Sequence, residues 1–178
     1  ATDYQIQTIE YYNDQNNEWE TLTTSDYTAE NSSDTIKNLK RAGKYRITVG
    51  GLNNYQGTLQ VLQTCGTDIS KYYVGIADSK TNYIYDGSEK RPSSFKIYNS
   101  DGNEVSNITS DCYTIDYVRT DSYSKKLVDV GTIYVIGVGV PTKGYYGRTN
   151  SRADKTNGYY KINSPRWTDA TLTITVDP

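Results

Sequence analysis

Ile9-Glu-Tyr-Tyr-Asn-Asp-Gln-Asn-Asn-Glu18 returns 86 residues later as Phe95-Lys-Ile-Tyr-Asn-Ser-Asp-Gly-Asn-Glu104. Leu22 and Tyr27-Thr28 return at the same spacing, as Ile108 and Tyr113-Thr114. Because this period is far longer than one supersecondary unit, the repeat indicates the duplication of a small domain. In both copies an alternating apolar stretch leads into turn-forming Asn, Asp and Gly residues, which favours β-hairpins.

The two copies divide the chain into two predicted domains, residues 1–66 and 67–178. Two further pairs of segments align with small insertions: Ala42-Gly-Lys-Tyr45 with Val130-Gly-Thr-Ile-Tyr134, and Asn54-Tyr-Gln-Gly-Thr58 with Tyr145-Tyr-Gly-Arg-Thr149. The second copy opens with a strand-forming stretch at 72–85 that has no counterpart in the first. Either the first strand of the first domain lies outside this chain, or its strand edge is covered in another way.

The composition favours strands and turns over helices. The 178 residues include 19 Tyr and 14 Gly, and alternating apolar positions recur along the chain. Strands are expected at 4–12, 18–24, 44–49, 59–63, 72–76, 83–85, 95–99, 105–108, 113–118, 132–140 and 171–176. We therefore predict an all-β protein.

Charge and hydropathy exclude some partners. The 19 basic and 21 acidic side chains give a net charge of −2 and are mixed along the chain, so nucleic acid is not an expected partner. No apolar run approaches the roughly 20 residues that cross a bilayer, which predicts no membrane insertion. Ala1 opens on polar sequence without the apolar stretch of a signal peptide, so we expect a mature or excised soluble segment.

The chain has two cysteines, Cys65 and Cys112, and neither belongs to a Cys-x-x-Cys motif that would indicate a metal or redox site. Two interpretations remain. The pair forms one disulfide that pins the junction between the copies, or the two are separate buried thiols that pack as small apolar residues.

Several short motifs carry a resemblance to a known family: Asp26-Tyr-Thr28, Asn54-Tyr-Gln-Gly-Thr58, Tyr85-Asp-Gly87 and Tyr113-Thr-Ile115. In combination they resemble the tandem immunoglobulin-like (YDG/MBG-like) repeats of secreted and surface proteins of Gram-positive, clostridia-type bacteria. The resemblance covers most of the chain and departs from the family pattern at the start of the first copy and at 150–170. It implies two tandem immunoglobulin-like β-sandwich domains, an extracellular or surface-attached location, and a stalk, spacer or adhesion role without catalytic residues.

Catalysis has few candidates in this sequence. The chain contains no His, so histidine-based acid–base chemistry and imidazole metal ligation are excluded. Asp14 with Glu18, and Asp101 with Glu104, are carboxylate pairs of the kind that glycosidases use, but both fall on predicted hairpin turns. The second turn also offers oxygen ligands for calcium, without the spacing of a known calcium loop; the candidates are Asn99, Asp101, Asn103 and Glu104. We expect no enzyme activity, no cofactor and no metal.

The insertion at about 150–170 belongs to one copy only and carries an aromatic cluster, Tyr159, Tyr160 and Trp167. Loops inserted into a repeated scaffold commonly carry function. Polar side chains that could bond sugar hydroxyls surround the cluster in sequence: Arg152, Asp154, Asn157 and Arg166. The alternative is a folded loop that buries its own rings. Tyr45, Tyr113 and Tyr134 are expected in the core or at its rim, and Trp19 in core or interdomain packing.

These observations together predict a non-catalytic extracellular bacterial surface module that serves adhesion, display or spacing. Its partners would be a polysaccharide or a host or neighbouring surface protein. The main alternative is a carbohydrate-binding module that uses the aromatic loop as a platform. A glycan-processing enzyme built on the carboxylate hairpins is the third interpretation.

Overall fold

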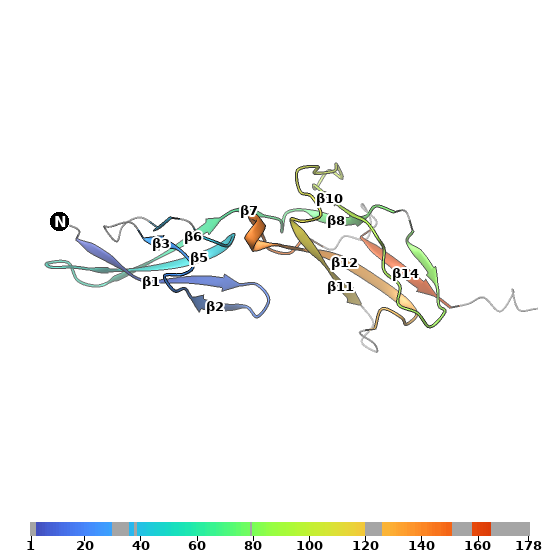
Figure 1. The fold of residues 1–178 in the computed structure, drawn as a ribbon, viewed down its shortest axis with the longest axis horizontal. Coiled ribbons are helices and arrows are strands. Elements are labelled where there is room, and N and C mark those ends of the chain that lie inside the picture. The colour runs from blue at the N-terminus through green and yellow to red at the C-terminus, as the bar shows by residue number, and fades with distance from the viewer. Residues whose placement is uncertain are drawn as a thin grey trace, which may run out of the picture.

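A computed structural model describes residues 3–29, 36–37, 39–78, 80–119, 126–150 and 158–164 of the chain. Within these residues the structure is rich in strands, and its one helical element is the 3₁₀ turn η1 (Pro141–Lys143). The predicted all-β class is confirmed. The strands gather into two lobes that lie end to end (Figure 1), here called lobe 1 (residues 3–65) and lobe 2 (residues 67–164).

Lobe 1 is built on one antiparallel sheet in the order β2-β1-β5-β6. Its strands are β1 (Tyr4–Asn13), β2 (Glu18–Thr21), β5 (Gly43–Gly51) and β6 (Thr58–Cys65). A short pair, β3 (Thr28–Ala29) with β4 (Ile36–Lys37), forms a second, small sheet. Among the described residues, the core of lobe 1 contains four buried side chains: Ile9, Tyr11, Leu22 and Tyr45.

Lobe 2 has two layers of strands. A pair of strands, β8 (Tyr73–Ile76) and β10 (Phe95–Tyr98), forms one layer. The other is a sheet in the order β11-β12-β14-β9, made of β11 (Tyr113–Arg119), β12 (Gly131–Gly139), β14 (Tyr159–Asn163) and β9 (Asn82–Ile84). Side chains of both layers share one core, which includes Val74 and Ile97 from the pair and Ile133 and Tyr160 from the sheet.

The predicted strands are mostly present, with two corrections. Residues 105–108 form no strand; the chain turns there, and only an isolated bridge joins Glu104 to Tyr98. The insertion was expected to be a loop, but its later part contains β14, which pairs with β12 and β9. The predicted strand at 171–176 lies outside the described residues.

Equivalent turns of the two copies use the same chemistry. The Oδ1 atom of Asn13 accepts a hydrogen bond from the backbone N–H of Gln15, and Oδ1 of Asn99 accepts one from Asp101, both at 3.0 Å. Such Asx turns stabilise a chain reversal locally. Further on, the N–H of Asp26 donates to the carbonyl of Thr23 and that of Cys112 to Thr109, each at 2.9 Å. The turns of the sequence repeat are therefore repeated in the structure, whereas the second strand of the hairpin is present only in lobe 1.

A nine-residue strand in each lobe begins at a glycine in an unusual conformation. Gly43 (φ 154°) opens β5 and Gly131 (φ 149°) opens β12, and both strands have nine residues. Counting from these glycines, Tyr45 corresponds to Ile133, and both side chains are buried (1% and 0% exposed). The alignment of Tyr45 with Tyr134 is thus one residue out of register, and Tyr134 points to the other face because side chains alternate along a strand.

The two lobes meet without a linker, because Gly66 alone separates β6 from β7 (Thr67–Asp68). β7 pairs in parallel with β13 (Tyr145–Tyr146). Cys65 and Cys112 are both free thiols, so of the two interpretations left open by the sequence the disulfide is not observed. The reason is their placement: Cys65 packs against the core of lobe 1, whereas Cys112 is buried in the core of lobe 2. The alternative interpretation, two separate thiols, is the one observed.

Candidate functional site

The predicted aromatic platform is represented by two residues in the described structure, Tyr159 and Tyr160, both on β14. Its other members lie outside the described residues: Arg152, Asp154, Asn157, Arg166 and Trp167. Because neighbouring side chains of a strand point to opposite faces, Tyr159 and Tyr160 do not share a surface. The structure does not bring these two rings together as one platform.

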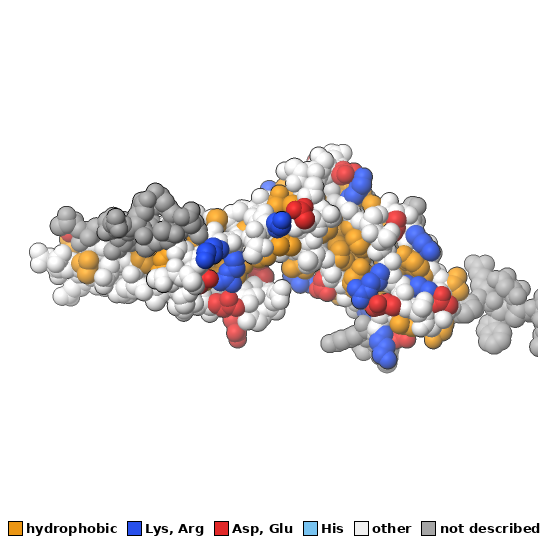
Figure 2. Space-filling model, in the orientation of Figure 1, with side chains coloured by type: hydrophobic (Ala, Val, Ile, Leu, Met, Phe, Trp, Pro, Cys, Tyr) orange, Lys and Arg blue, Asp and Glu red, His pale blue; other side chains and the backbone are white. Residues whose placement is uncertain are grey.

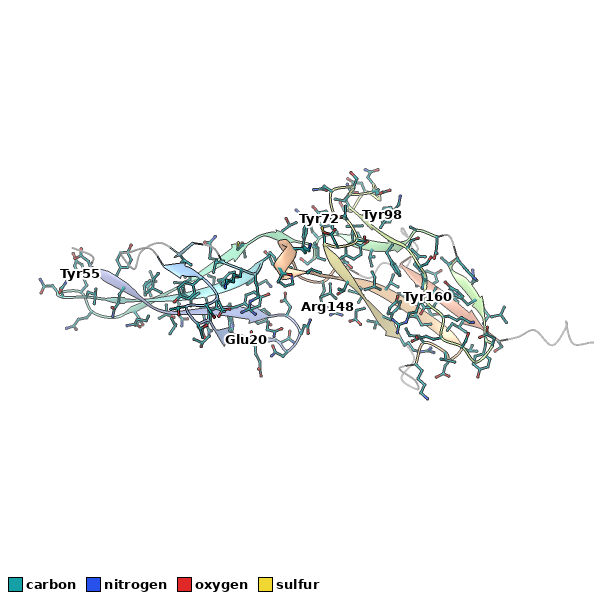
Figure 3. The ribbon with its side chains drawn as sticks, in the orientation of Figure 1. Glu20, Tyr55, Tyr72, Tyr98, Arg148 and Tyr160 are labelled. Carbon is teal, nitrogen blue, oxygen red and sulfur yellow. The ribbon has the colours of Figure 1, made fainter. Side chains whose placement is uncertain are left out.

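Tyr160 is a core residue of lobe 2 and is not available to a ligand. Its exposed fraction is 0%, and its ring meets Tyr83 and Tyr117 edge-on at centroid distances of 5.5 and 6.4 Å. Its hydroxyl donates to the carbonyl of Lys90 at 2.7 Å, and burial raises the pKa of the phenol above its ordinary value. Figure 3 shows Tyr160 within lobe 2. The expectation that Tyr160 stacks on a sugar is therefore wrong.

Tyr159 lies on the outer face of the same sheet and is half-buried. Its ring packs against Tyr134 at 5.9 Å, and the ammonium of Lys161 lies 5.8 Å from the ring centroid. These contacts leave part of the ring on the surface. Of the predicted platform, Tyr159 is the described member that stays a candidate for ligand contact.

The carboxylate pairs lie on exposed hairpin turns. Glu104 forms an ion pair with Lys96 at 2.6 Å, and the N–H of Glu18 donates to Oδ1 of Asn16 at 3.2 Å. Oδ1 of Asn99, a candidate calcium ligand, accepts two backbone N–H groups of its own turn. Among the described residues, no three acidic, Cys or His side chains are grouped so that they could hold a metal ion.

A cluster of aromatic and charged side chains covers the outer face of the lobe 1 sheet. We call it the Trp19 cluster; its members are Glu10, Tyr12, Trp19, Lys44 and Arg46. Trp19 on β2 lies opposite Tyr12 on β1, with ring centroids 5.2 Å apart. The guanidinium of Arg46 lies 4.6 Å from the Trp19 ring centroid, which is the geometry of a cation–π contact.

The charges of the Trp19 cluster are held in fixed positions. Arg46 donates from Nε and Nη2 to the two carboxylate oxygens of Glu10, each at 2.6 Å. This bidentate pair lowers the pKa of Glu10, chiefly through the hydrogen bond from Arg46. The ammonium of Lys44 lies 5.6 Å from the centroid of the Tyr12 ring. The cluster therefore offers aromatic rings beside oriented hydrogen-bonding groups.

A shallow hollow of about 310 Å³ adjoins this cluster, lined by Trp19, Lys44, Leu62 and Thr64 among others. Leu62 is 71% exposed. An indole, an ammonium and a hydroxyl thus border one depression. Small-ligand sites combine apolar walls with a few placed polar groups, and this hollow has both on a small scale.

The opposite face of the lobe 1 sheet is apolar and partly open. Its buried half packs on Leu22 and on residues of the β3–β4 region, such as Ile36. Two hollows open on this face, one of about 320 Å³ that reaches Ile36 and one of about 620 Å³, and the walls of both include Val49 and Val61. Tyr4, Tyr55 and Leu59 beside them are 47, 60 and 62% exposed. Figure 3 shows Tyr55 at the end of lobe 1 away from lobe 2.

The face of the molecule shown in Figure 2 has no large patch of one charge sign that would indicate another site. Acidic and basic side chains are interspersed there among apolar and neutral ones. Within the described part of the chain, no helix has the length and apolar character needed to span a bilayer. Comparison with protein-family models, with curated proteins and with solved structures gave no match.

Sequence reasoning missed both surfaces of lobe 1. Trp19 was assigned to packing because its counterpart in the second copy, Val105, is not aromatic. The cluster could have been predicted from strand alternation. Glu10 and Tyr12 are two residues apart on one expected strand, and Lys44 and Arg46 are two residues apart on another, so each pair shares one face. The first copy lacks a counterpart of residues 72–85, which indicates that part of its sheet is left uncovered. Which face of the sheet is uncovered could be found only from the strand register.

Proposed function

We propose that this chain is a non-catalytic module of a bacterial surface or secreted protein, consisting of two tandem immunoglobulin-like units that act as a stiff spacer. The junction between the lobes is the observation that supports this role. One backbone hydrogen bond crosses it, from the Ala42 N–H to the Pro141 carbonyl at 2.8 Å. Directly after Gly66 the chain is held by lobe 2, where the N–H of Thr67 donates to the carbonyl of Gly144 at 2.8 Å and that of Ile69 to Tyr146 at 2.9 Å. Lobes joined in this way resist bending better than lobes joined by a flexible linker.

Close packing at Gly66 adds to this stiffness. Gly66 has φ 87°, a conformation that favours glycine. A Cβ atom at this position would lie 2.4 Å from the Cβ of Ala42 and 2.6 Å from the carbonyl oxygen of Gly144. The junction thus has no room for a side chain between the lobes.

Small-angle X-ray scattering tests the spacer role. We expect the native chain to give the scattering of one extended, rigid particle. Gly66→Val should broaden the distribution of maximum dimensions while both cores stay folded by circular dichroism, because the valine separates the contacts around Ala42. A native chain as broadly distributed as the variant would contradict the spacer proposal. Antibody labelling of intact cells that express the parent protein tests the surface location.

Carbohydrate binding is the second candidate function, and the Trp19 cluster favours it. A partly exposed indole beside Lys44, Arg46 and Glu10 resembles the pairing of ring faces with hydroxyl partners that sugar sites use. This candidate differs from the platform predicted from sequence, which depended on Trp167.

A polysaccharide pull-down with two variants separates the two carbohydrate sites. If the cluster binds glycan, Trp19→Ala should abolish retention on the polysaccharide and Trp167→Ala should leave it unchanged. The reverse result would assign binding to the 150–170 segment. Absence of retention on every glycan, with the native fold intact, would remove carbohydrate binding from the functions of this chain.

A further inference from the structure

β6 is an edge strand of lobe 1 without the usual protection of edges. Its eight residues include no charged side chain and no proline, and none of the described strands pairs with its outer side. Leu59, Val61 and Leu62 are 62, 41 and 71% exposed. Natural edge strands usually carry a charge, a proline or a bulge that prevents another strand from pairing. As far as the described residues show, the outer edge of β6 is therefore open to an incoming strand.

The open apolar face lies directly beside this edge. Leu59 pairs with Val49 and Val61 with Ile47, so these side chains point to the same face of the sheet. The hollow of about 320 Å³ extends from Tyr4 and Ile6 to Val61. A strand added to β6 would place every second side chain next to this surface. An occupant with alternating apolar residues and little charge fits both the edge and the face.

The sequence Thr171-Leu-Thr-Ile-Thr-Val176 has this pattern, with three apolar residues alternating with threonine. In the repeat it is the counterpart of β6, which pairs with β5 from Gly43 to Gly50. In lobe 2 the corresponding place beside β12 is held by β14, from Gly131 with Ile162 to Tyr134 with Tyr159. Over Gly131–Tyr134, the place beside β12 that β6 takes beside β5 is therefore already filled by β14.

The reach of the chain excludes pairing of 171–176 with β6 of the same molecule. β14 ends beside Gly131, at the end of β12 that is farther from lobe 1 (Figure 1). The nine residues of β12 span about 26 Å at ~3.3 Å per residue, and the junction adds further distance. Seven residues lead from 164 to 171, which is at most about 25 Å when fully extended. The segment falls short of β6 in its own chain.

We propose that residues 171–176 of one copy add as a strand to β6 of a second copy, so that the chains join head to tail. Such a contact uses different surfaces on the two partners and leaves one of each free at the ends, so it generates open chains rather than closed dimers. This inference goes beyond the spacer role and does not depend on it.

The experiment combines sedimentation of the 178-residue chain with binding of a synthetic peptide of residues 169–178. The average mass of the chain should rise continuously with concentration, and a chain of residues 1–168 should stay monomeric. The peptide should bind the shortened chain and should inhibit association of the full chain. Val61→Lys should weaken peptide binding at least about tenfold, because an unpaired ammonium would be buried at the new contact.

Val118→Lys is the matched control, because Val118 is 39% exposed and lies on β11 in lobe 2, far from β6 in the sequence. This variant should bind the peptide as the native chain does. Three results would overturn the proposal: a chain that stays monomeric and a peptide that does not bind; association that persists in the 1–168 chain; or a 1–168 chain that unfolds, which would assign the segment to its own lobe.

Discussion

Lobe 1 and lobe 2 start from the same hairpin and use it differently. In lobe 2, β10 pairs with β8, and this pair forms a layer over the sheet that contains β12. In lobe 1, β1 is the counterpart of β10, but it pairs directly with β5. The described residues of lobe 1 include no counterpart of β8, and β5 takes the edge of β1 that corresponds to the edge of β10 occupied by β8.

The difference shows what one strand contributes to a small β fold. With β8 present, two layers enclose a core of thirteen buried residues. Without it, the described strands of lobe 1 form mainly one sheet, and four buried residues make its core. A sheet whose apolar face is not covered buries less area, so its hydrophobic stabilisation is smaller. We expect lobe 1 to be the less stable lobe.

The largest effect is expected at the centre of lobe 2. Tyr160→Ala should lower the free energy of unfolding of this lobe by about 3–5 kcal/mol, since it removes a fully buried ring and leaves a cavity. Hydrogen exchange followed by NMR would report the two lobes separately. Tyr159→Ala on the outer face is the control and should cost much less. A similar loss of protection in lobe 1 would show that the lobes unfold together.

A pair of leucines tests whether the face of lobe 1 is open. Leu22→Ala should cost about 2–3 kcal/mol, because Leu22 is 9% exposed, whereas Leu59→Ala at 62% exposure should cost less than about 0.5 kcal/mol. Urea unfolding of dilute protein measures both, since dilution prevents association. Equal costs would mean that another segment covers Leu59.

The two glycines that open the long strands test the structural repeat. Gly131→Ala should cost about 1–2 kcal/mol, because its φ of 149° is strained for a residue with a Cβ. Gly43→Ala should cost more, since its Cβ would lie 2.5 Å from Cε2 of Tyr11. Thermal unfolding of both variants gives the comparison. A variant as stable as the native chain would show that the strand starts differently in that lobe.

The smallest effect concerns the ion pair of Glu10 and Arg46 in lobe 1. Arg46 lowers the pKa of Glu10 in the folded state. The contribution of the ion pair to the free energy of unfolding is therefore complete above the unfolded-state pKa of about 4.3, and it is lost as pH falls through the lower folded-state pKa. Glu10→Gln should lower the free energy of unfolding by less than about 1 kcal/mol at pH 7, and by progressively less as the solution becomes more acidic. Urea unfolding across this pH range measures it, with Glu18→Gln as the control. A cost that does not change with pH would exclude the ion pair as its source.

Sequence predicted the elements that depend on local chemistry. The turn at Asn13, its copy at Asn99 and the burial of Tyr45 follow from turn residues and strand alternation. The partners of each strand could not be predicted from the sequence, because strand pairing depends on which other strands are present. The repeat, in particular, does not indicate that β1 pairs with β5. The prediction for Tyr160 is wrong for a related reason: the absence of a counterpart in the first copy indicates a loop, but this segment contains a strand of the sheet.

The order of the lobes along the chain has a consequence for biosynthesis. Lobe 1 leaves the ribosome first, and the 112 residues from 67 to 178 need on the order of ten seconds more to be made. Until Pro141 is synthesised, the N–H of Ala42 lacks the carbonyl that it bonds in the finished protein. During this interval the nascent protein exposes both the β6 edge and its apolar face, so it is then that chaperones or early export would protect it most.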